Sequence, residues 1–441
     1  MSAQEHTVAV GHAASDVPAA TMTRKQKKAV LAGVLGNAIE YLDWGIYASL
    51  APVFASQFFA DGDPATAFLS TLAIFAVGFF VRPLGGLVLG TYADRYGRKK
   101  ALTLTVSLMS AGGLVIAVCP TYEHIGVFSP LLLLVARLVQ AFSAGGEWPS
   151  SVSYIVESAA PGKRAFVGSF QQVSTAGGIL LASLLALVVT SALNDQQMHA
   201  FGWRIAFAFA AALGLMVLWL RVRTQESQHF DDAELSGKSH KPVTKLFAEH
   251  KLSMLRVVGI TVPGTIVYYL WITNMPGYAN ATTGLGLDKA LLANSLAVVL
   301  FMLLLPLGGL VSDRLGRRST FMFFLVGFAV YSWPAFRLLE GGGFWTLLLV
   351  EVVGVILLVG NSANVAAIYA ELFPTSVRTT GTGLPYATAV ALFGGTAPYL
   401  TTWLTSIGQR DKIWTYVVVS VLIGMVTIMT MPDGAEKGTL D

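Results

Sequence analysis

Twelve apolar runs of about 20 residues or more, separated by short polar breaks, constrain the fold of this chain more than any other feature. A bilayer core about 30 Å thick needs about 20 helical residues to cross it, and the backbone polar groups must be satisfied within the protein. The runs therefore predict twelve membrane-spanning helices. They cover residues 29–58, 66–92, 100–120, 129–157, 165–193, 203–222, 253–280, 289–312, 319–339, 344–371, 378–407 and 412–431.

The composition argues against a water-soluble enzyme. Only 12% of the residues are charged and 54% are hydrophobic, whereas about 25% of a soluble domain is charged. The single cysteine, Cys119, can form neither an intramolecular disulfide nor a thiolate metal site. The seven histidines fall in the N-terminal tail or in polar segments. We therefore expect an all-α membrane protein with no metal site and no cofactor.

The basic residues alternate between the two sides of the predicted bundle. Of the 29 lysines and arginines, 22 fall on one set of loops and five on the other. The side that is rich in lysine and arginine is expected to be cytoplasmic, with both termini on it. This topology accounts for the net charge of +4 without a nucleic-acid partner. We expect a multi-pass protein of the plasma or inner membrane.

The longest polar stretch divides the chain into two sets of six runs. We expect it to be a cytoplasmic linker between two six-helix bundles, flanked by cytoplasmic tails at both ends. The expected order is a tail at 1–28, a bundle at 29–222, the linker at 223–252, a second bundle at 253–431 and a tail at 432–441.

The two halves repeat a short motif at corresponding places. GxxxDRxGRK begins at Gly90 after the second run, and GxxxDRxGRR begins at Gly309 after the eighth. A second pair of similar segments begins at Glu157 and Glu371, after the fourth and tenth runs. Glycine permits the tight turn, while the basic residues suit a cytoplasmic lipid surface. The repetition indicates that the two bundles are pseudo-symmetric.

These motifs resemble the major facilitator superfamily, whose signature between the second and third spans is the loop that begins here at Gly90. GNxxExxD from Gly36, RPxGG from Arg82, RxxQxxSxGGE from Arg137 and ELFPxxVR from Glu371 resemble its metabolite:proton symporter branch. The resemblance implies twelve transmembrane helices in two pseudo-symmetric six-helix bundles. It also implies proton-coupled transport by alternating access.

Four ionisable residues within three of the spans lie at similar depth. At 1.5 Å per residue, Glu40, Asp43, Arg82 and Glu147 are each roughly 15–20 Å from the cytoplasmic ends of their spans. A charge at the centre of a membrane helix costs at least about 2.5–3.5 kcal/mol, so each of them needs a function or a partner. Together they predict a polar layer near the midplane, where transporters of this kind bind substrates.

We expect Glu40 and Asp43 to carry the coupling proton. The two acids lie within one helical turn and repel each other unless one is protonated. In related transporters an acid of the first span pairs with an arginine at the position of Arg137, so protonation would be linked to conformation. The alternatives are a buried polar network that only fixes helix packing and a static Asp43–Arg137 ion pair.

Arg82 is the expected ligand of a substrate carboxylate, because guanidinium groups bind carboxylates through two parallel hydrogen bonds. Alternatively, it neutralises one of the neighbouring acids, with Glu147 as its structural partner. The repeat places Glu351 opposite Arg137 and Asn361 opposite Glu147, and the second half is expected to supply neutral polar and aromatic walls. The other expected substrate-binding residues are Glu147, Tyr47, Gln140, Gln171, Tyr268, Asn361 and Tyr386.

The repeated loops and the helices that follow them supply acids and bases for an ion-pair lattice at the cytoplasmic face. If this lattice closes only when the cytoplasmic gate is shut, it favours the outward-open state. Surface pairs are individually weak, so a network is required. Its expected members are Asp94, Arg95, Arg98, Glu157, Arg164, Asp313, Arg317, Glu371 and Arg378.

The favoured function is proton-coupled import of a small organic acid by a functional monomer in the lipid bilayer. No ATP-binding GxxxxGK[ST] loop occurs in the sequence, and the closest resemblance within the branch is to 2-oxoglutarate and related dicarboxylate permeases. The alternative is an importer of proline or betaine, because the same branch contains such transporters. An efflux antiporter, a channel and a membrane enzyme are less favoured.

Overall fold

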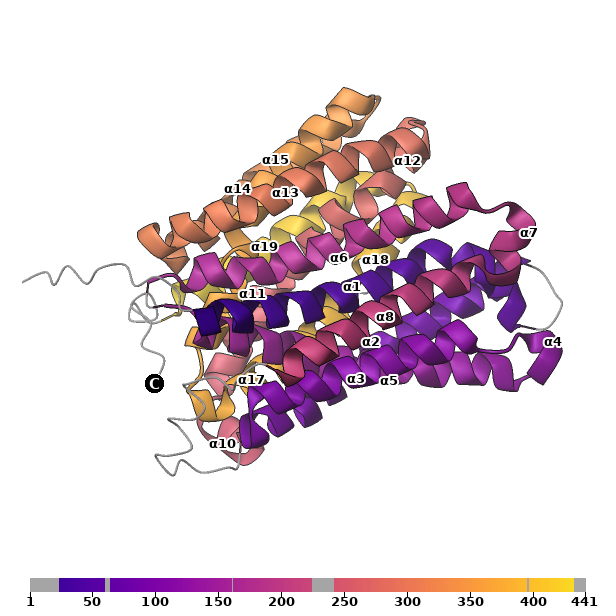
Figure 1. Cartoon of the computed structure of the whole chain (residues 1–441). Coiled ribbons are helices and arrows are strands. Elements are labelled where there is room, and N and C mark those ends of the chain that lie inside the picture. The colour runs from indigo at the N-terminus through magenta and orange to yellow at the C-terminus, as the bar shows by residue number, and fades with distance from the viewer. Residues whose placement is uncertain (1–23, 60–63, 161, 224–241, 395, 432–441) are drawn as a thin grey trace, which may run out of the picture.

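The computed structural model describes residues 24–59, 64–160, 162–223, 242–394 and 396–431, and these residues form helices and connecting turns without a β-strand. The long helices of the first half lie together in one bundle beside those of the second half (Figure 1). The first bundle contains α1 (Arg24–Phe58), α2 (Pro64–Tyr96), α3 (Arg98–Val118), α5 (Phe128–Glu157), α6 (Arg164–Ala192) and α8 (Trp203–Val222).

Two spans of the second half change helix type within their length. The seventh passes from α11 (Lys251–Tyr268) through the π-helical turn η2 (Tyr269–Asn274) into α12 (Met275–Thr283). The eleventh passes from α17 (Arg378–Ala389) through η4 (Val390–Gly394) into α18 (Ala397–Ser406). The other spans are α13 (Leu287–Leu315), α14 (Arg317–Leu339), α15 (Phe344–Ser362) with α16 (Val365–Glu371), and α19 (Ile413–Met429).

Short helices occupy several connections. They are α4 (Tyr122–Ile125), α7 (Asp195–Gln197), η1 (Met198–Gly202), α10 (Pro242–Glu249), η3 (Thr375–Val377) and η5 (Arg410–Lys412).

Each of the twelve apolar runs coincides with a helical span in the described part of the chain, which confirms the all-α fold. The largest shift is at the start, where α1 begins at Arg24 rather than at residue 29. Most of the expected linker, residues 224–241, lies outside the described residues, as do 1–23 and 432–441. Within the described residues, eight helices are long and apolar enough by themselves to cross a membrane.

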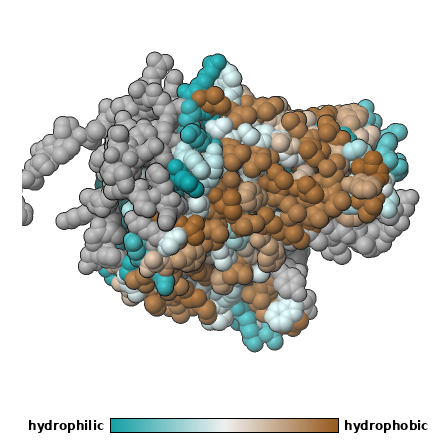
Figure 2. Space-filling view, turned by 90° about the horizontal axis from the view of Figure 1, so that it is seen from below, coloured by the Kyte–Doolittle hydropathy of each residue, from teal (hydrophilic) through white to brown (hydrophobic). Residues whose placement is uncertain are grey.

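The outer surface is apolar around the middle of the bundle. Phe80, Val330 and Trp345 are each more than 70% exposed, although side chains of this kind are normally buried. Figure 2 shows a broad apolar band with polar residues toward the two ends. Such a band matches the hydrocarbon core of a bilayer, and the protein is a multi-pass membrane protein.

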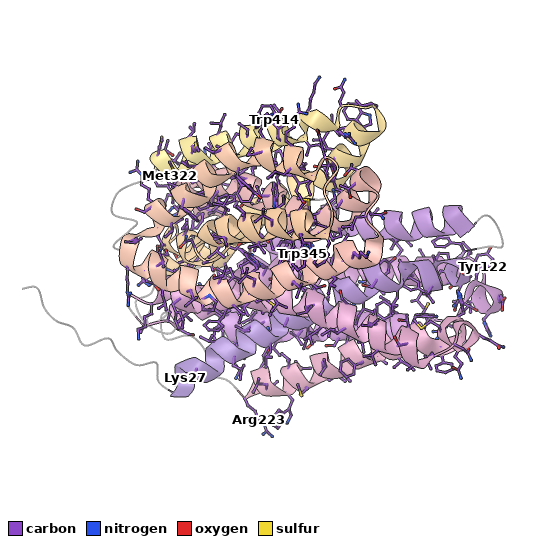
Figure 3. All side chains as sticks on the ribbon, turned by 90° about the horizontal axis from the view of Figure 1, so that it is seen from above. Lys27, Tyr122, Arg223, Met322, Trp345 and Trp414 are labelled. Carbon is purple, nitrogen blue, oxygen red and sulfur yellow. The ribbon has the colours of Figure 1, made fainter. Side chains whose placement is uncertain are left out.

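The two ends of the bundle can be told apart by the repeated loops. We call the end that carries Gly97 and Gly316 the motif end; Lys27 and Arg223 also lie there, whereas Tyr122 lies at the opposite end (Figure 3). Gly97 and Gly316 have φ of 101° and 91°. Side chains are strained at such angles, so glycine allows the sharp turns from α2 to α3 and from α13 to α14.

The halves pack according to the same plan. Within the first half α2 packs on α5 and α3 on α8, and within the second α13 packs on α15 and α14 on α19. Between the halves, α2 packs on α17 and α13 packs on α6. The second helix of each half therefore contacts the fifth helix of the other, as expected for two pseudo-symmetric bundles.

The crossing of α2 and α5 brings two backbones into contact and thereby sets the position of Arg82. A Cβ on Gly145 would overlap the carbonyl oxygen of Arg82, and one on Gly85 would overlap that of Phe142. The glycines on both helices are therefore required for this close approach.

Replacing Gly145 by alanine should destabilise the protein by about 1–3 kcal/mol, because the new methyl group has no space between α2 and α5. Thermal unfolding of the purified protein in detergent measures the change. Gly277→Ala is the matched control, since a Cβ there meets no atom within 4 Å. Equal melting temperatures for the two variants would contradict the close packing.

Candidate functional site

At the motif end, one aspartate from each half caps a helix of the other half. The Asp94 carboxylate accepts the backbone N–H groups of Thr379 at 3.0 Å and Thr380 at 2.7 Å, at the start of α17. Its repeat counterpart Asp313 accepts those of Ala165 at 3.0 Å and Phe166 at 2.9 Å, at the start of α6.

These caps are favourable for two physical reasons. The first N–H groups of a helix have no partner within the helix, and the helix dipole is positive there. A carboxylate satisfies both requirements with charge-assisted hydrogen bonds. Because each carboxylate and its helix come from different halves, the caps hold the halves together at this end.

Ion pairs surround the caps. Glu157 bonds to Arg98 at 3.3 Å within the first half and to Arg378 of the second half at 2.7 Å, and all three side chains are fully buried. Glu371 is paired in the equivalent way, with Arg317 at 3.2 Å and with Arg164 of the other half at 3.7 Å. The structure thus joins eight of the nine residues expected in the lattice.

Arg95 is the exception. Its side chain is exposed, and its guanidinium lies 5.4 Å from the ring of Tyr96 on the same helix. Arg95 therefore stands outside the lattice in this conformation. Asp94, directly before it, and Arg98, three residues after it, take the buried positions. Adjacent residues of a helix point about 100° apart, so Arg95 faces outward where Asp94 faces inward.

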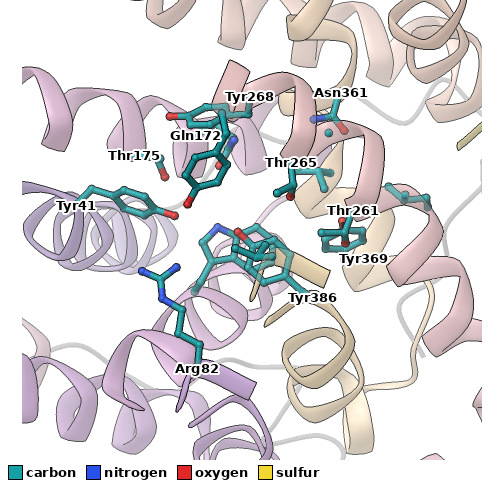
Figure 4. Close-up of a pocket in the computed structure, with 16 residues that line it drawn as sticks. Tyr41, Arg82, Gln172, Thr175, Thr261, Thr265, Tyr268, Asn361, Tyr369 and Tyr386 are labelled. Carbon is teal, nitrogen blue, oxygen red and sulfur yellow. Dashed lines mark hydrogen bonds between the residues drawn. The ribbon is translucent and has the colours of Figure 1, made fainter. Parts of the chain in front are cut away.

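A central cavity lies between the two halves. The centre of a water molecule can occupy about 60 Å³ of it, and both bundles contribute to the lining (Figure 4). Its lining residues include Tyr41, Arg82, Trp148, Gln172, Thr175, Thr261, Thr265, Tyr268, Tyr269, Asn361, Tyr369 and Tyr386.

Arg82 is the only cation among the described residues that line this cavity. Its guanidinium lies 4.1 Å from the centre of the Trp44 ring and 4.8 Å from that of Phe79. Cation–π contacts of this kind hold the charge without consuming its hydrogen-bond donors. Figure 4 shows Arg82 and Tyr41 reaching the cavity from first-half helices, opposite Asn361.

Glu40 approaches Arg82 from a smaller adjoining pocket, which is lined by both residues. The closest approach is 3.9 Å, between Glu40 Oε1 and Arg82 Nη2. This is beyond hydrogen-bond range, and Glu40 Oε2 has no hydrogen-bond partner in the structure. The two charged groups therefore lie near each other but are not joined by a hydrogen bond.

Aromatic rings from both halves close the cavity toward the motif end. The rings of Trp148 and Tyr386 stack with centroids 3.8 Å apart, and Tyr369 meets Trp148 edge-on at 5.8 Å. Thr261 bonds to the Tyr369 hydroxyl at 2.6 Å. Since Tyr369 is two residues from Glu371, these rings lie between the cavity and the ion-pair lattice.

Asp43 lies in a separate cluster and not beside Glu40. It accepts a hydrogen bond of 2.9 Å from Arg137, whose guanidinium covers the Tyr47 ring at 3.7 Å. Gln140 is buried in the same cluster and donates to the backbone of Met109. Tyr47 and Gln140, expected to bind substrate, are therefore absent from the cavity lining in this conformation.

Glu147 also differs from its expected placement. It is bonded to Arg221 and Thr105, away from the cavity lining, and Arg82 is not its partner. Arg221, at the end of α8, further donates to backbone carbonyls of α1 and α3. The sequence pattern assigned Arg221 to the linker side, because it stands at the boundary of its apolar run.

Gln171 belongs to a buried amide network. Its side chain donates to Asn37 at 2.7 Å and accepts from Ser151 at 2.9 Å, thereby joining α6 to α1 and α5. Gln171 is not among the cavity residues, but its neighbour Gln172 is. A one-residue step along a helix rotates a side chain by about 100°, which explains the difference.

Four expected substrate ligands do line the cavity: Arg82, Tyr268, Asn361 and Tyr386. Sequence reasoning missed several others. The Thr261–Thr265 spacing of one helical turn and the position of Tyr41 next to Glu40 were usable signals. Trp148 carried none, because an aromatic residue in a span is as typical of packing as of binding. The missed lining residues are Tyr41, Trp148, Thr175, Thr261, Thr265 and Tyr369.

Comparison with known proteins gives consistent matches. The model of the Major Facilitator Superfamily matches residues 33–398. The alpha-ketoglutarate permease of Escherichia coli K12 is 36% identical over 414 residues, which are 93% of this chain and 95% of the permease. The proline/betaine transporter of Escherichia coli K12 is 30% identical over 424 residues, 94% of this chain and 85% of that protein.

A solved structure resembles the fold over nearly its whole length. The proton:xylose symporter XylE bound to 6-bromo-6-deoxy-D-glucose superposes with a TM-score of 0.79 at 17% identity. The match covers 94% of this chain and 98% of the other. At this identity the likeness concerns the fold alone.

Asp94→Asn should weaken closure of the motif end, because the amide offers one backbone N–H an acceptor and presents an N–H₂ group to the other. A hydrogen bond to a charged group contributes about 1.5–3 kcal/mol. We therefore expect the ratio of open to closed molecules at this end to rise roughly tenfold. Ser153 is buried at this contact, 3.3 Å from Thr379, and replacing it by cysteine in a Cys119→Ser chain provides a reporter.

The measurement is the rate at which a water-soluble maleimide labels this cysteine. Asp94→Asn should raise the rate, whereas Arg95→Gln, at an exposed position of the same motif, should leave it unchanged. If Asp94→Asn labels no faster than the starting protein, the cap does not control this end.

Proposed function

Because this chain belongs to the Major Facilitator Superfamily, a family of membrane transporters and not of enzymes, we propose that it is a proton-coupled symporter importing a small organic acid. A dicarboxylate such as 2-oxoglutarate is the first candidate substrate. The observation that carries the proposal is the lone cation, Arg82, among the described residues that line the cavity. The 36% identity to the alpha-ketoglutarate permease supports it.

The cavity offers the groups that a keto acid or dicarboxylate would need. Arg82 can hold one carboxylate through two parallel hydrogen bonds. The Tyr268 hydroxyl has no hydrogen-bond partner in the structure, although it is buried at the cavity wall. A buried polar group without a partner is costly, so this hydroxyl is suited to a second polar group of the substrate.

Glu40 couples a proton to this binding event. A substrate carboxylate at Arg82 stands beside Glu40, and two like charges at short range destabilise each other unless one is protonated. Proton binding by Glu40 therefore accompanies substrate binding by Arg82. Of the two acids of α1, Glu40 is the better proton carrier, because Asp43 is already held by Arg137 at 2.9 Å.

The motif end is assigned to the cytoplasm on the basis of its basic loops. Caps and ion pairs seal this end, so this conformation is closed toward the cytoplasm. Release into the cytoplasm requires the halves to separate at the motif end and the Trp148–Tyr386 stack to part. Rigid-body rocking of two similar bundles around a central site accomplishes both.

Proton coupling is also required by the membrane potential. Moving one negative charge inward against 100 mV costs about 2.3 kcal/mol, and a dicarboxylate carries two. Each proton that enters with the substrate cancels one such charge. Accumulation of a carboxylate therefore depends on the protons that travel with it, and no other cofactor is invoked.

Import of proline or betaine is the second candidate function. It is favoured by the aromatic lining of the cavity, including Tyr41, Tyr269 and the Trp148–Tyr386 stack, because aromatic faces bind quaternary ammonium groups. The 30% identity to the proline/betaine transporter supports the same alternative. Arg82 would then hold the single carboxylate of the zwitterion.

Uptake into proteoliposomes under an inward proton gradient tests the substrate. 2-Oxoglutarate, citrate, proline and glycine betaine should be supplied in parallel, with accumulation of the dicarboxylate expected. Arg82→Gln should reduce that uptake at least about 100-fold, since a charge-assisted bidentate contact exceeds about 3 kcal/mol.

Arg82→Lys is the matched variant, because it keeps the charge and loses the fork geometry. It should retain more uptake than Arg82→Gln. Accumulation of betaine or proline, with no uptake of any carboxylate, would overturn the dicarboxylate proposal and favour the second candidate.

The two acids of α1 should respond differently to neutralisation. Glu40→Gln should abolish proton-driven accumulation and spare exchange of substrate across the membrane, because exchange needs no net proton movement. Asp43→Asn should chiefly destabilise the fold by about 3–5 kcal/mol, since it leaves Arg137 buried without its partner. Thermal unfolding separates the two effects, and substrate-driven proton uptake that survives in both variants would refute this coupling.

A further inference from the structure

A buried carboxyl group of the second half lies outside the cavity lining. Glu351 of α15 is 0% exposed, and its Oε1 accepts a hydrogen bond of 3.2 Å from the Asn294 amide of α13. Its Oε2 has no hydrogen-bond partner in the structure. Within the described residues no cation lies within ion-pair distance of it, in contrast to Asp43, Glu147 and Glu157.

The groups that face Glu351 are neutral. The Tyr331 hydroxyl of α14 and the Trp271 indole N–H of η2 both donate to the adjacent carbonyl of Val350, at 3.1 and 3.4 Å. Lys289 at the start of α13 is exposed, as is Arg337 at the end of α14, which pairs with Glu340. An isolated charge in such surroundings is strongly unfavourable, so burial favours the neutral form of this carboxyl group.

This carboxyl group is linked to the part of the seventh span that departs from α-helical geometry. The Asn294 amide, besides bonding to Glu351, donates at 3.3 Å to the carbonyl oxygen of Trp271. Trp271 lies within η2, whose first residue, Tyr269, lines the central cavity. π-Helical turns often occur at functional sites and permit local rearrangement. Glu351, Asn294 and η2 thus form a continuous path to the cavity wall.

We propose that Glu351 is a second proton-binding site of the symporter, in the half opposite to Glu40, and that its protonation state controls η2. When Glu351 is protonated, Asn294 is shared between the carboxyl group and Trp271, as observed. Loss of the proton leaves a carboxylate that competes for both amide hydrogens and for water, which releases the Trp271 carbonyl. Movement of α11 and α12 then accompanies proton release.

This proposal rests on the proposed proton-coupled transport, and the number of protons per substrate tests it. In proteoliposomes the gradient that just balances net 2-oxoglutarate flux gives this ratio. Glu351→Gln, which keeps the shape and the acceptor for Asn294, should transport one proton fewer per substrate than the unaltered chain. Glu340→Gln is the matched control, because it removes an exposed carboxylate at the same end and should leave the ratio unchanged.

Infrared spectroscopy tests the proton itself without a substrate. The carbonyl-stretch band of protonated carboxylic acids should lose intensity in Glu351→Gln at neutral pH and stay unchanged in Glu340→Gln. No loss of intensity would overturn the proposal, whatever the substrate. A lost band with an unchanged ratio would make Glu351 a static acid, which also overturns it.

The two proposals fail in different ways. If the unaltered chain does not transport 2-oxoglutarate, the proposed substrate is wrong, and the ratio is then measured with whichever solute of the panel accumulates. If Glu351→Gln is correctly folded but loses exchange as well as accumulation, its role is structural and the second proton site is refuted. Retained exchange with weakened accumulation supports the site.

Discussion

An acid inside a membrane bundle must either have a cationic partner or carry a proton, and the arrangement of this protein follows from that constraint. Among the described residues, most of the buried acids are paired with one or two guanidinium groups drawn from other helices. Two depart from the rule: the contact of Glu40 with Arg82 is loose, and Glu351 has an amide in place of a cation. The matched acids are Asp43 with Arg137, Glu147 with Arg221, Glu157 with Arg98 and Arg378, and Glu371 with Arg164 and Arg317.

The sequence was sufficient to predict the fold. The length of each apolar run identifies a membrane-spanning helix, and the repeated loop motif identifies the two similar halves. Depth was also predictable, so Arg82 could be placed near the cavity, and the repeat that sets Asn361 opposite Glu147 placed this amide there too. The partners of the ionisable side chains could not be predicted, because the depth of a residue does not say which way its side chain points around the helix. Glu147 was therefore expected to bind substrate, or alternatively to pair with Arg82 at equal depth, whereas its partner is Arg221 at a helix end.

The two halves share a packing plan and divide the chemistry between them. The first half brings Arg82 and, from the adjoining pocket, Glu40, while the second brings neutral hydroxyl, amide and aromatic groups such as Tyr268 and Asn361. A substrate between the halves is thus bound to a charge on one side and to hydrogen-bonding groups on the other. Separation of the halves on either face changes both sets of contacts at once, which links binding to conformation.

Two sets of ion pairs close the motif end, one seam around Glu157 and one seam around Glu371. They are alike in sequence and differ in solvent exposure. The seam around Glu157 is dry, whereas Arg164 and Arg317 in the other seam keep 11% of their side-chain surface in contact with solvent. Water can replace hydrogen bonds only where it reaches them. Solvent therefore reaches the hydrogen bonds of the seam between α13 and α6, while the seam between α2 and α17 excludes it.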